Sequence, residues 1–471
     1  MTSSRSATPP AAGSVLVLGI VLVLAAYALS QGLTTLSFGY AAGALAAVTL
    51  FGLVFIRTDF GIYVVIFSML LSPEFSAGGA IAEGRSIVLR SEDFVLIVIG
   101  MSWLAKTAVN KEIGLVTKTP LNRPILLYVA ATMLATLVGY LFETVSGLSG
   151  FFYVLKYVEY FFVYYMVVNN LRDRPHAWRM IVAAFVTAAI VALVGLAQVP
   201  SGQRVSAPFE GEGGEPNTFG GYLLFMMAIA AGIALETRRL RVRLWSVAVL
   251  GLMLVPFAFT LSRASYLGVI PTLLALTVLA TNRRFMVGVL LFLLVCSPLL
   301  VFVMPAAVTN RILYTFQPEA HQPTVKLGKV GLDPSTSARF FSFKQAFEGW
   351  MSRPILGYGV TGFGFMDAQY SRSLVETGIV GLGAFLWMAW SVLKNGLHAA
   401  RVLRDPEERG VAIGFVAGTI GLLVHAIGSN TFIIVRIMEP FWLAAGIVMM
   451  LPILQRDESK AEVRPAPAPV A

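Results

Sequence analysis

The stretch 238–261 reads RRLRVRLWSVAVLGLMLVPFAFTL, a dense basic cluster that runs directly into an apolar segment. The hydrocarbon core of a bilayer is about 30 Å thick, and a helix of ~20 apolar residues crosses it. Lys and Arg collect at the cytoplasmic ends of such helices. The stretch therefore predicts a membrane-spanning helix over 244–261 that begins on the cytoplasmic side.

Apolar runs of this kind extend over most of the chain. Hydrophobic residues make up 57% of the sequence and charged residues 13%, whereas a soluble domain carries roughly 25% charged residues. We therefore expect an all-α polytopic membrane protein with about 12–14 transmembrane helices. The candidate spans are 14–31, 37–56, 60–72, 93–109, 123–141, 151–169, 179–199, 217–235, 244–261, 264–281, 285–304, 375–394, 410–428 and 436–454.

The distribution of basic residues predicts the orientation. With the N-terminus in the cytoplasm, the dense clusters at 238–243 and 282–284 both fall on the cytoplasmic side, as the positive-inside rule requires. The net charge of +10 is then explained by membrane topology, and we expect no nucleic-acid partner. The prediction is a multi-pass protein of the bacterial inner membrane with both termini in the cytoplasm.

One segment on the periplasmic side, 305–374, is far longer than an ordinary connection, and such long loops tend to be functional. Helical spacing in its second half places Phe340, Phe343, Phe347 and Trp350 on about one face. We divide the chain, as one integrated domain, into a bundle of eleven spans at 1–304, a large periplasmic loop with short helices at 305–374, three final spans at 375–454 and a disordered cytoplasmic tail at 455–471.

The arginines that fall on the outer side against the charge bias include Arg204, Arg263, Arg339, Arg372 and Arg436. Arg at the end of a span is costly unless it reaches water or meets an anion. Taken singly, each is most simply paired with a nearby carboxylate or a lipid phosphate. Arg263 is the exception, because a very short turn between two spans holds it at the membrane surface. Several converging guanidiniums would form a pocket for pyrophosphate, since Arg binds phosphate oxygens in bidentate fashion.

Few groups on the outer side could bind a metal or a cofactor, and we expect neither. The acidic segment 211–217 could form a metal loop, although a helix cap built on Asn217 is the simpler interpretation. His425 lies within a predicted span and is either functional or a neutral, hydrogen-bonded core residue. Lys156 and Glu159, three residues apart on one helix face, predict an internal ion pair.

An ordered set of short motifs occupies the region from about 200 to 382. The motifs are PNTFGGY at 216–222, LSRASYLG at 261–268, SAR at 337–339, WMSRPILGYG at 350–359 and LVETGIVG at 374–381. In this order and topology they resemble the O-antigen ligase / Wzy-type O-antigen (exopolysaccharide) polymerase superfamily. The resemblance implies a GT-C-like fold and metal-independent glycosyl transfer from a polyprenyl-pyrophosphate-linked glycan.

The resemblance also assigns expected roles to individual residues. Arg204, Arg263 and Arg339 would neutralise the departing pyrophosphate, where negative charge develops. Asp367 or Glu376 would orient or deprotonate the acceptor hydroxyl, with Arg263 as the third expected catalytic group.

Further contacts with the substrate are expected from Asn217, Tyr370 and Arg372. Ligases of the family carry a His-Asn pair at the position where this chain has Asp367. A carboxylate followed by a tyrosine is more similar to the polymerase-type members.

The function that follows as an expectation is polymerisation of polyprenyl-pyrophosphate-linked glycan repeat units at the periplasmic face of the membrane. A ligase that transfers the glycan to lipid A-core or another acceptor remains an alternative, as does a lipid-linked glycan flippase, which should show inverted repeats. A non-catalytic assembly subunit is also open. Expected partners are the lipid-linked glycans and the bilayer, with a chain-length regulator and a flippase as further candidates.

Overall fold

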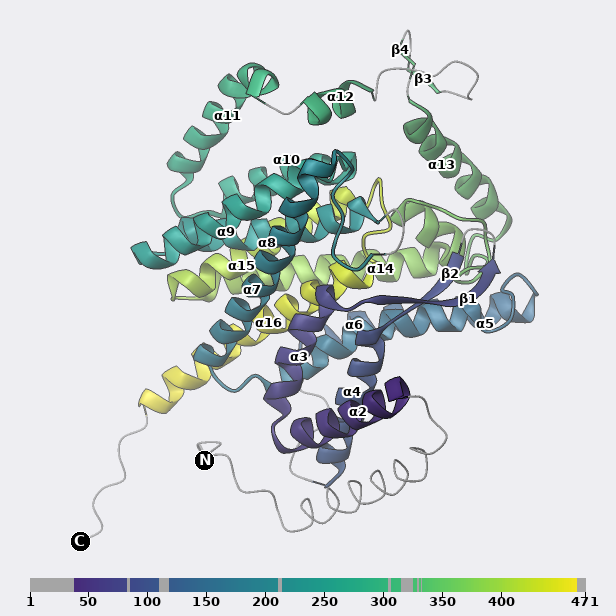
Figure 1. Cartoon of the computed structure of the whole chain (residues 1–471), viewed down its shortest axis with the longest axis horizontal. Coiled ribbons are helices and arrows are strands. Elements are labelled where there is room, and N and C mark those ends of the chain that lie inside the picture. The colour runs from purple at the N-terminus through teal and green to yellow at the C-terminus, as the bar shows by residue number, and fades with distance from the viewer. Residues whose placement is uncertain are drawn as a thin grey trace.

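The computed structural model of the chain describes residues 38–82, 85–109, 118–210, 214–303, 306–314, 325–327, 330–331 and 333–463. Within these ranges the fold is a bundle of helices, and the helices of the long loop, α12 and α13, lie at one margin of it (Figure 1). The predicted first span at 14–31 and the last residues of the chain, 464–471, lie outside the described residues.

The described helices and strands follow one another along the chain within these bounds: α2 Phe38–Ile56, α3 Thr58–Leu71, β1 Glu74–Ala82, β2 Arg85–Arg90, α4 Ser91–Val109, α5 Asn122–Leu141, α6 Ser149–Asn170, α7 Arg174–Gln198, η1 Val199–Ser201, α8 Pro216–Glu236, α9 Leu240–Phe259, α10 Arg263–Leu279, α11 Arg283–Val303, α12 Ala306–Tyr314, β3 Lys326–Leu327, β4 Val330–Gly331, α13 Pro334–Ser352, α14 Gln369–Val402, α15 Pro406–His425 and α16 Val435–Val463.

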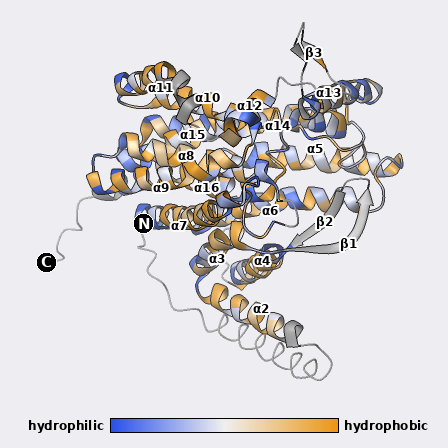
Figure 2. Ribbon diagram, turned by 45° about the horizontal axis from the view of Figure 1, so that its top comes forward, coloured by the Kyte–Doolittle hydropathy of each residue, from blue (hydrophilic) through white to orange (hydrophobic). Residues whose placement is uncertain are grey.

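The protein is an all-α polytopic membrane protein, as the sequence predicts. Among the described residues, eight helices are long and apolar enough to cross a membrane, namely α5 to α9 and α14 to α16, and shorter apolar helices lie in α2, α3 and α10. Every predicted span after the first coincides with one helix. The ribbon coloured by hydropathy shows hydrophobic residues along most of the helices (Figure 2). The eight long helices and the three shorter ones do not include α4 and α11, which also coincide with predicted spans.

Two features depart from the sequence prediction. β1 pairs antiparallel with β2 between α3 and α4, and β3 pairs with β4 in the long loop; such pairing satisfies backbone groups where the chain leaves a helix. The predicted disordered tail was wrong over 455–463, because α16 continues to Val463. Glu458 in this extension forms an ion pair with Arg174 of α7 at 3.2 Å. This contact joins the extension to the bundle.

Helix α8 lies at the centre of the bundle and packs closely on α15. Glycines make this approach possible: a Cβ added to Gly414 would lie 2.5 Å from the carbonyl oxygen of Ala228. Gly410 and Gly232 face each other one turn further along in the same way. Small residues at helix contacts are typical of membrane bundles, because van der Waals packing has to supply the association that water cannot drive there. α8 therefore forms a rigid support for whatever lies at its two ends.

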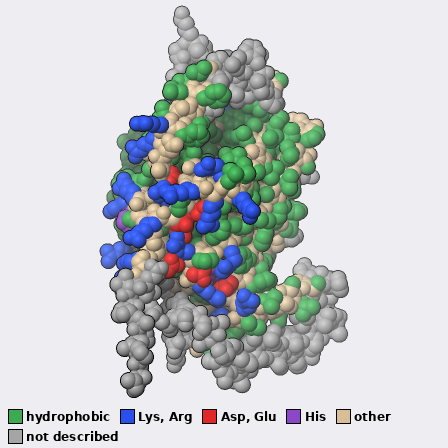
Figure 3. All heavy atoms as spheres, turned by 90° about the vertical axis from the view of Figure 1, so that its left-hand side faces the viewer, with side chains coloured by type: hydrophobic (Ala, Val, Ile, Leu, Met, Phe, Trp, Pro, Cys, Tyr) green, Lys and Arg blue, Asp and Glu red, His purple; other side chains and the backbone are tan. Residues whose placement is uncertain are grey.

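Ion pairs join several helix ends at one side of the bundle. Arg409 of α15 contacts Glu236 at the end of α8 at 2.5 Å, and Arg174 at the start of α7 contacts Glu408 of α15 at 2.6 Å. Arg239, which caps α9, lies 3.6 Å from Glu407. Figure 3 shows basic side chains gathered around acidic ones at this end of the molecule. The starts of α7, α9 and α15 and the end of α8 thus lie together, which agrees with the parity predicted from the sequence.

We predict that this charged end is cytoplasmic and that α13 lies on the opposite side. Alkaline phosphatase fused after Arg241 or Arg404 should be inactive, whereas fusion after the exposed Lys344 of α13 should give an active enzyme, because basic clusters are retained in the cytoplasm. Active phosphatase at Arg241 together with inactive phosphatase at Lys344 would reverse the orientation.

Candidate functional site

The motifs found in the sequence come together where α8, α10, α13 and α14 begin. Ser262 caps α10, its hydroxyl accepting a hydrogen bond from the backbone N–H of Ser265 at 3.3 Å. The same hydroxyl donates to Oδ1 of Asn217, the second residue of α8, at 2.8 Å. This contact links the PN motif (PNTFGGY, 216–222) to the SR motif (LSRASYLG, 261–268) across 45 residues. It also places Arg263 beside the start of α8. The side chain of Asn217 therefore connects the start of α8 to the start of α10.

Arg263 forms a bidentate ion pair with Asp333, at 2.6 Å from Nη1 to Oδ2 and 3.1 Å from Nη2 to Oδ1. Asp333 is fully buried and also accepts hydrogen bonds from the backbone and hydroxyl of Thr336. Burial acts to raise the pKa of Asp333, but the hydrogen bonds from Arg263 and Thr336 outweigh it and hold the pKa below its usual value. The sequence analysis did not single out Asp333. The sequence signal that could have identified it is Asp333 directly before Pro334, because an Asp followed by a Pro is typical of a helix N-terminus.

Arg339, in the first half of α13, is held more loosely. Its Nη2 lies 3.7 Å from Oδ2 of Asp367, whose side chain is 45% exposed. The Nε of Arg339 is buried and has no hydrogen-bond partner among the described residues. Burial, with a smaller contribution from Glu215, raises the pKa of Asp367, and Arg339 opposes this shift. Arg339 and Asp367 thus form a longer and more exposed contact than the Arg263–Asp333 pair.

Arg372 and Glu376, by contrast, form a buried pair within α14. Nε of Arg372 lies 3.1 Å from Oε2 of Glu376, and the two side chains are 6% and 3% exposed. Oε1 of Glu376 accepts the backbone N–H of Thr361 at 3.1 Å. Glu376 therefore holds the glycine-rich segment 357–364 against α14, and the structure turns this carboxylate away from solvent.

A break in α14 at Gly378 makes that attachment possible. Gly378 has φ 62° and ψ −166°, so the usual helical bonds to the carbonyls of Val375 and Glu376 are absent. These two carbonyls accept instead from the N–H groups of Tyr358 at 3.0 Å and Gly359 at 2.8 Å. The freed N–H of Ile379 donates to the carbonyl of Pro354 at 2.9 Å, and that of Val380 to Ile355 at 3.3 Å. The two motifs 350–359 and 374–381 therefore replace each other's missing backbone partners.

Two further predicted site residues are engaged with backbone carbonyls. Arg204 is exposed and donates from Nε to the carbonyl of Thr260 at 3.0 Å and from Nη2 to Leu261 at 3.4 Å. It thus caps the end of α9, where a cation interacts favourably with the helix dipole. The hydroxyl of Tyr370 donates to the carbonyl of Leu423 in α15 at 2.6 Å. Both residues position helices around the site.

The turn between α15 and α16 contributes residues that the sequence analysis passed over. Nδ2 of Asn430 donates to the carbonyl of Met366 at 2.6 Å, directly before Asp367. His425 is fully buried, with Nδ1 2.6 Å from the hydroxyl of Thr431, which agrees with a hydrogen-bonded core histidine.

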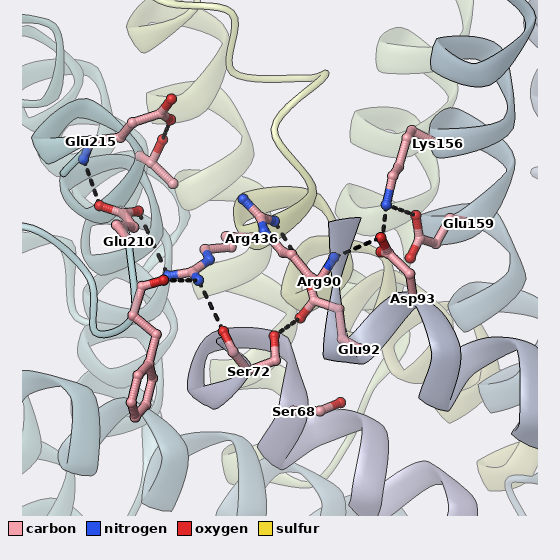
Figure 4. A network of polar contacts seen from close by, with 12 residues as sticks. Ser68, Ser72, Arg90, Glu92, Asp93, Lys156, Glu159, Glu210, Glu215 and Arg436 are labelled. Atoms are coloured by element: carbon pink, nitrogen blue, oxygen red, sulfur yellow. Dashed lines mark hydrogen bonds and ion pairs between the residues drawn. The ribbon is translucent and has the colours of Figure 1, made fainter. Parts of the chain in front are cut away.

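The expected Lys156–Glu159 ion pair forms at 3.1 Å (Figure 4). Asp93 joins it from α4.

Within the described parts of the chain, no three His, Cys, Asp or Glu residues are grouped so that they could hold a metal ion. The site itself presents the guanidinium of Arg339 beside the partly exposed carboxylate of Asp367.

Comparison with protein families gives one match, and it covers this region. The family model described as O-antigen ligase matches residues 248–386. This segment of the chain is therefore similar to the O-antigen ligase family. The matched segment runs from α9 into α14 and contains Arg263, Asp333, Arg339, Asp367 and the break at Gly378. Arg204 and Asn217 lie before it. No curated protein matches the chain.

We predict that Gly378→Ala disrupts the contact between the two motifs. A Cβ at this position would overlap the carbonyl oxygen of Ile355, and φ of 62° with extended ψ suits glycine alone. Strain of this kind typically costs about 1–3 kcal/mol. Thermal unfolding in detergent should show a lowered midpoint. Gly383→Ala in the same helix is the matched control, because nothing lies within 4 Å of its added Cβ, and it should leave the midpoint unchanged or raise it. Equal midpoints for both variants would contradict the proposed constraint.

Proposed function

We propose that this protein polymerises polyprenyl-pyrophosphate-linked glycan repeat units at the periplasmic face of the bacterial inner membrane, without a metal ion. One observation carries the proposal: the three arginine–carboxylate pairs at the outer helix ends differ in exposure. Asp333 and Glu376 are buried and tightly held, whereas Asp367 is 45% exposed and 3.7 Å from Arg339. Asp367 is thus the carboxylate of the three that a substrate can reach, and it lies beside a guanidinium with a spare donor.

In the proposed reaction, the hydroxyl oxygen of the acceptor glycan attacks the anomeric carbon of the donor glycan. The bond from that carbon to the pyrophosphate oxygen breaks, and the lipid pyrophosphate departs with the electron pair. Asp367 accepts the proton of the hydroxyl. Arg339, with Arg263 behind it, stabilises the charge that develops on the leaving group. Arg binds phosphate oxygens well in this setting because its planar fork offers two donors at once.

The raised pKa of Asp367 suits this role. A carboxylate with an ordinary pKa near 4 is a weak base at neutral pH, and general-base efficiency improves as the pKa approaches the working pH. Burial and the neighbouring Glu215 shift Asp367 in that direction. The same carboxylate could instead anchor the acceptor hydroxyl through a hydrogen bond, which serves the same transfer.

A ligase is the second candidate, because the matched family carries that description. It would use the same donor and the same bond cleavage, and only the acceptor would differ, a lipid A-core or another glycan carrier instead of a second lipid-linked unit. A flippase that delivers the donor and a regulator of chain length would be the natural partners of either enzyme.

We expect Asp367→Asn to lower turnover about 10²–10⁴-fold, the usual contribution of general acid–base catalysis. The measurement is the rate of glycan polymer formation in membrane vesicles from the native host. Glu348→Gln is the matched control, since Glu348 on α13 is exposed and pairs only loosely with Lys344 at 3.8 Å. Near-normal turnover in Asp367→Asn would reduce Asp367 to a structural residue and remove the proposed base.

The pH dependence follows from the direction of the shift. Asp367 is active when ionised, so turnover falls as pH decreases through its pKa. Because that pKa is raised, the acid limb of the rate profile should lie above the ordinary aspartate value of about 3.9. An acid limb at or below that value would contradict the role.

Deletion of the gene should distinguish the two candidate functions. Loss of a polymerase leaves single repeat units on the lipid carrier, whereas loss of a ligase leaves completed polymer on it. We expect single units, identified by mass spectrometry of extracted lipids. Accumulated lipid-linked polymer would assign the ligase function instead.

A further inference from the structure

Arg436, the second residue of α16, is fully buried and reaches across three segments of the chain (Figure 4). Its Nη1 donates to the carbonyl of Pro208 at 2.7 Å. Nη2 donates to the carbonyl of Ser72 at the end of α3 at 3.2 Å and to that of Phe209 at 3.4 Å. Nη1 also lies 3.8 Å from Oε1 of Glu210. One side chain thus ties the loop before α8 to α3 and α16.

The loop continues from this attachment to the candidate site. Oε2 of Glu210 accepts the backbone N–H of Glu215 at 2.6 Å. Oε2 of Glu215 in turn accepts the hydroxyl of Thr218 in the first turn of α8 at 2.7 Å. Glu215 lies near enough to Asp367 to raise the pKa of that carboxyl. A series of polar contacts therefore runs from Arg436 through Glu210 and Glu215 to the first turn of α8.

On its other side, the attachment rests on a buried network that leaves it little freedom (Figure 4). The hydroxyl of Ser72 donates to Oε2 of Glu92 at 2.7 Å. Oε1 of Glu92 lies 3.3 Å from Nη1 of Arg90. The next residue, Asp93, contacts Lys156 of α6. The end of α3 is thereby fixed by α4 and α6, so Arg436 holds the loop against a rigid support.

We propose that Arg436 is a positioning residue for the transfer reaction: it fixes the loop before α8 and, through Glu210 and Glu215, the first turn of α8 beside the site. The proposal rests on the function proposed for Asp367. A buried ionic group is weak evidence for stability, because its desolvation often offsets the attraction it gains. Hydrogen bonds to three carbonyls from two separate segments do, however, define geometry. The role follows from what Arg436 holds in place.

The consequence appears in the electrostatics of Asp367. The charged groups that face it are Glu215 from the loop before α8, Arg339 from α13 and Arg372 from α14. Glu215 raises the pKa of Asp367, and the two arginines lower it. If the loop is released, the effect of Glu215 weakens while both arginines remain. The acid limb of the rate profile should then move to lower pH, even though Arg436 itself does not contact Asp367.

The test compares Arg436→Lys with Glu210→Ala in the full-length protein. Lys keeps the charge but cannot bond several carbonyls in the geometry of a planar fork. Glu210→Ala removes the carboxylate that lies between Arg436 and the N–H of Glu215 and leaves the helices intact, so it serves even if Arg436→Lys fails to fold. Arg409→Lys is the matched control. Arg409 also connects helices, but it donates hydrogen bonds to Glu236 and Thr281 at the opposite end of α8.

The first measurement is hydrogen exchange of the backbone amides in 205–210, which needs no substrate. Both test variants should exchange at least tenfold faster than the wild type, and Arg409→Lys should not. The second measurement is the rate profile of polymer formation against pH. We expect the acid limb of both variants to move down by about half a pH unit, as in Glu215→Gln, with kcat lowered and KM for the donor little changed.

Unchanged exchange in both variants would overturn the proposal, as would faster exchange with a wild-type kcat and acid limb. Failure of the proposed function has a different signature. In that case Asp367→Asn would remain active and Glu215→Gln would not move the acid limb, whatever the exchange measurements show.

Discussion

A charge inside a membrane bundle has to find a partner there, because neither lipid nor the apolar core can solvate it. The helix ends around the candidate site are organised by that constraint. Arg263 reaches Asp333 seventy positions away, and Arg372 pairs with Glu376 one turn along the same helix. Removing one partner of such a pair leaves an uncompensated buried charge and typically costs about 3–5 kcal/mol. These pairs therefore hold α10, α13 and α14 in register around the site.

The same constraint identifies the group that is available for chemistry. Pairs that are short and buried have little hydrogen-bonding capacity left for a substrate. The Arg339–Asp367 contact is longer and partly exposed, and it lies where the other pairs bring the helix ends together. The reactive group we propose is thus the more exposed and less tightly held one, and the buried pairs act as its frame. A pyrophosphate arriving here would supply a second anion for Arg339.

Local patterns in the sequence predicted the helices well, because hydrophobic length and basic clusters are properties of single segments. The i,i+3 pair Lys156–Glu159 could be predicted for the same reason. Asp333 and the carbonyl partners of Arg436 could not, since they lie 70 and more than 200 residues from the arginines that they contact. The helical continuation of α16 was missed because its charged residues suggest a tail, while its contacts with Arg174 and Arg404 are made to segments distant in the sequence. The two hairpins carried no pattern strong enough to be predicted.

The motifs that resemble the family act mainly on the backbone. The PN and SR motifs meet through Ser262 and Asn217, and the segments around Gly357 and Gly378 exchange backbone hydrogen bonds. A match to these motifs therefore indicates a shared frame, whereas the choice of acceptor depends on the side chains that the frame displays. Asp367 stands between the two backbone-locked motifs, on a segment that Asn430 supports from the α15–α16 turn. A carboxylate at this point accepts a proton or a hydrogen bond without needing a second group to orient a tautomer, as a histidine would. The difference between polymerase and ligase is thus expected in the surroundings of this one position, while the helices that carry it can stay the same.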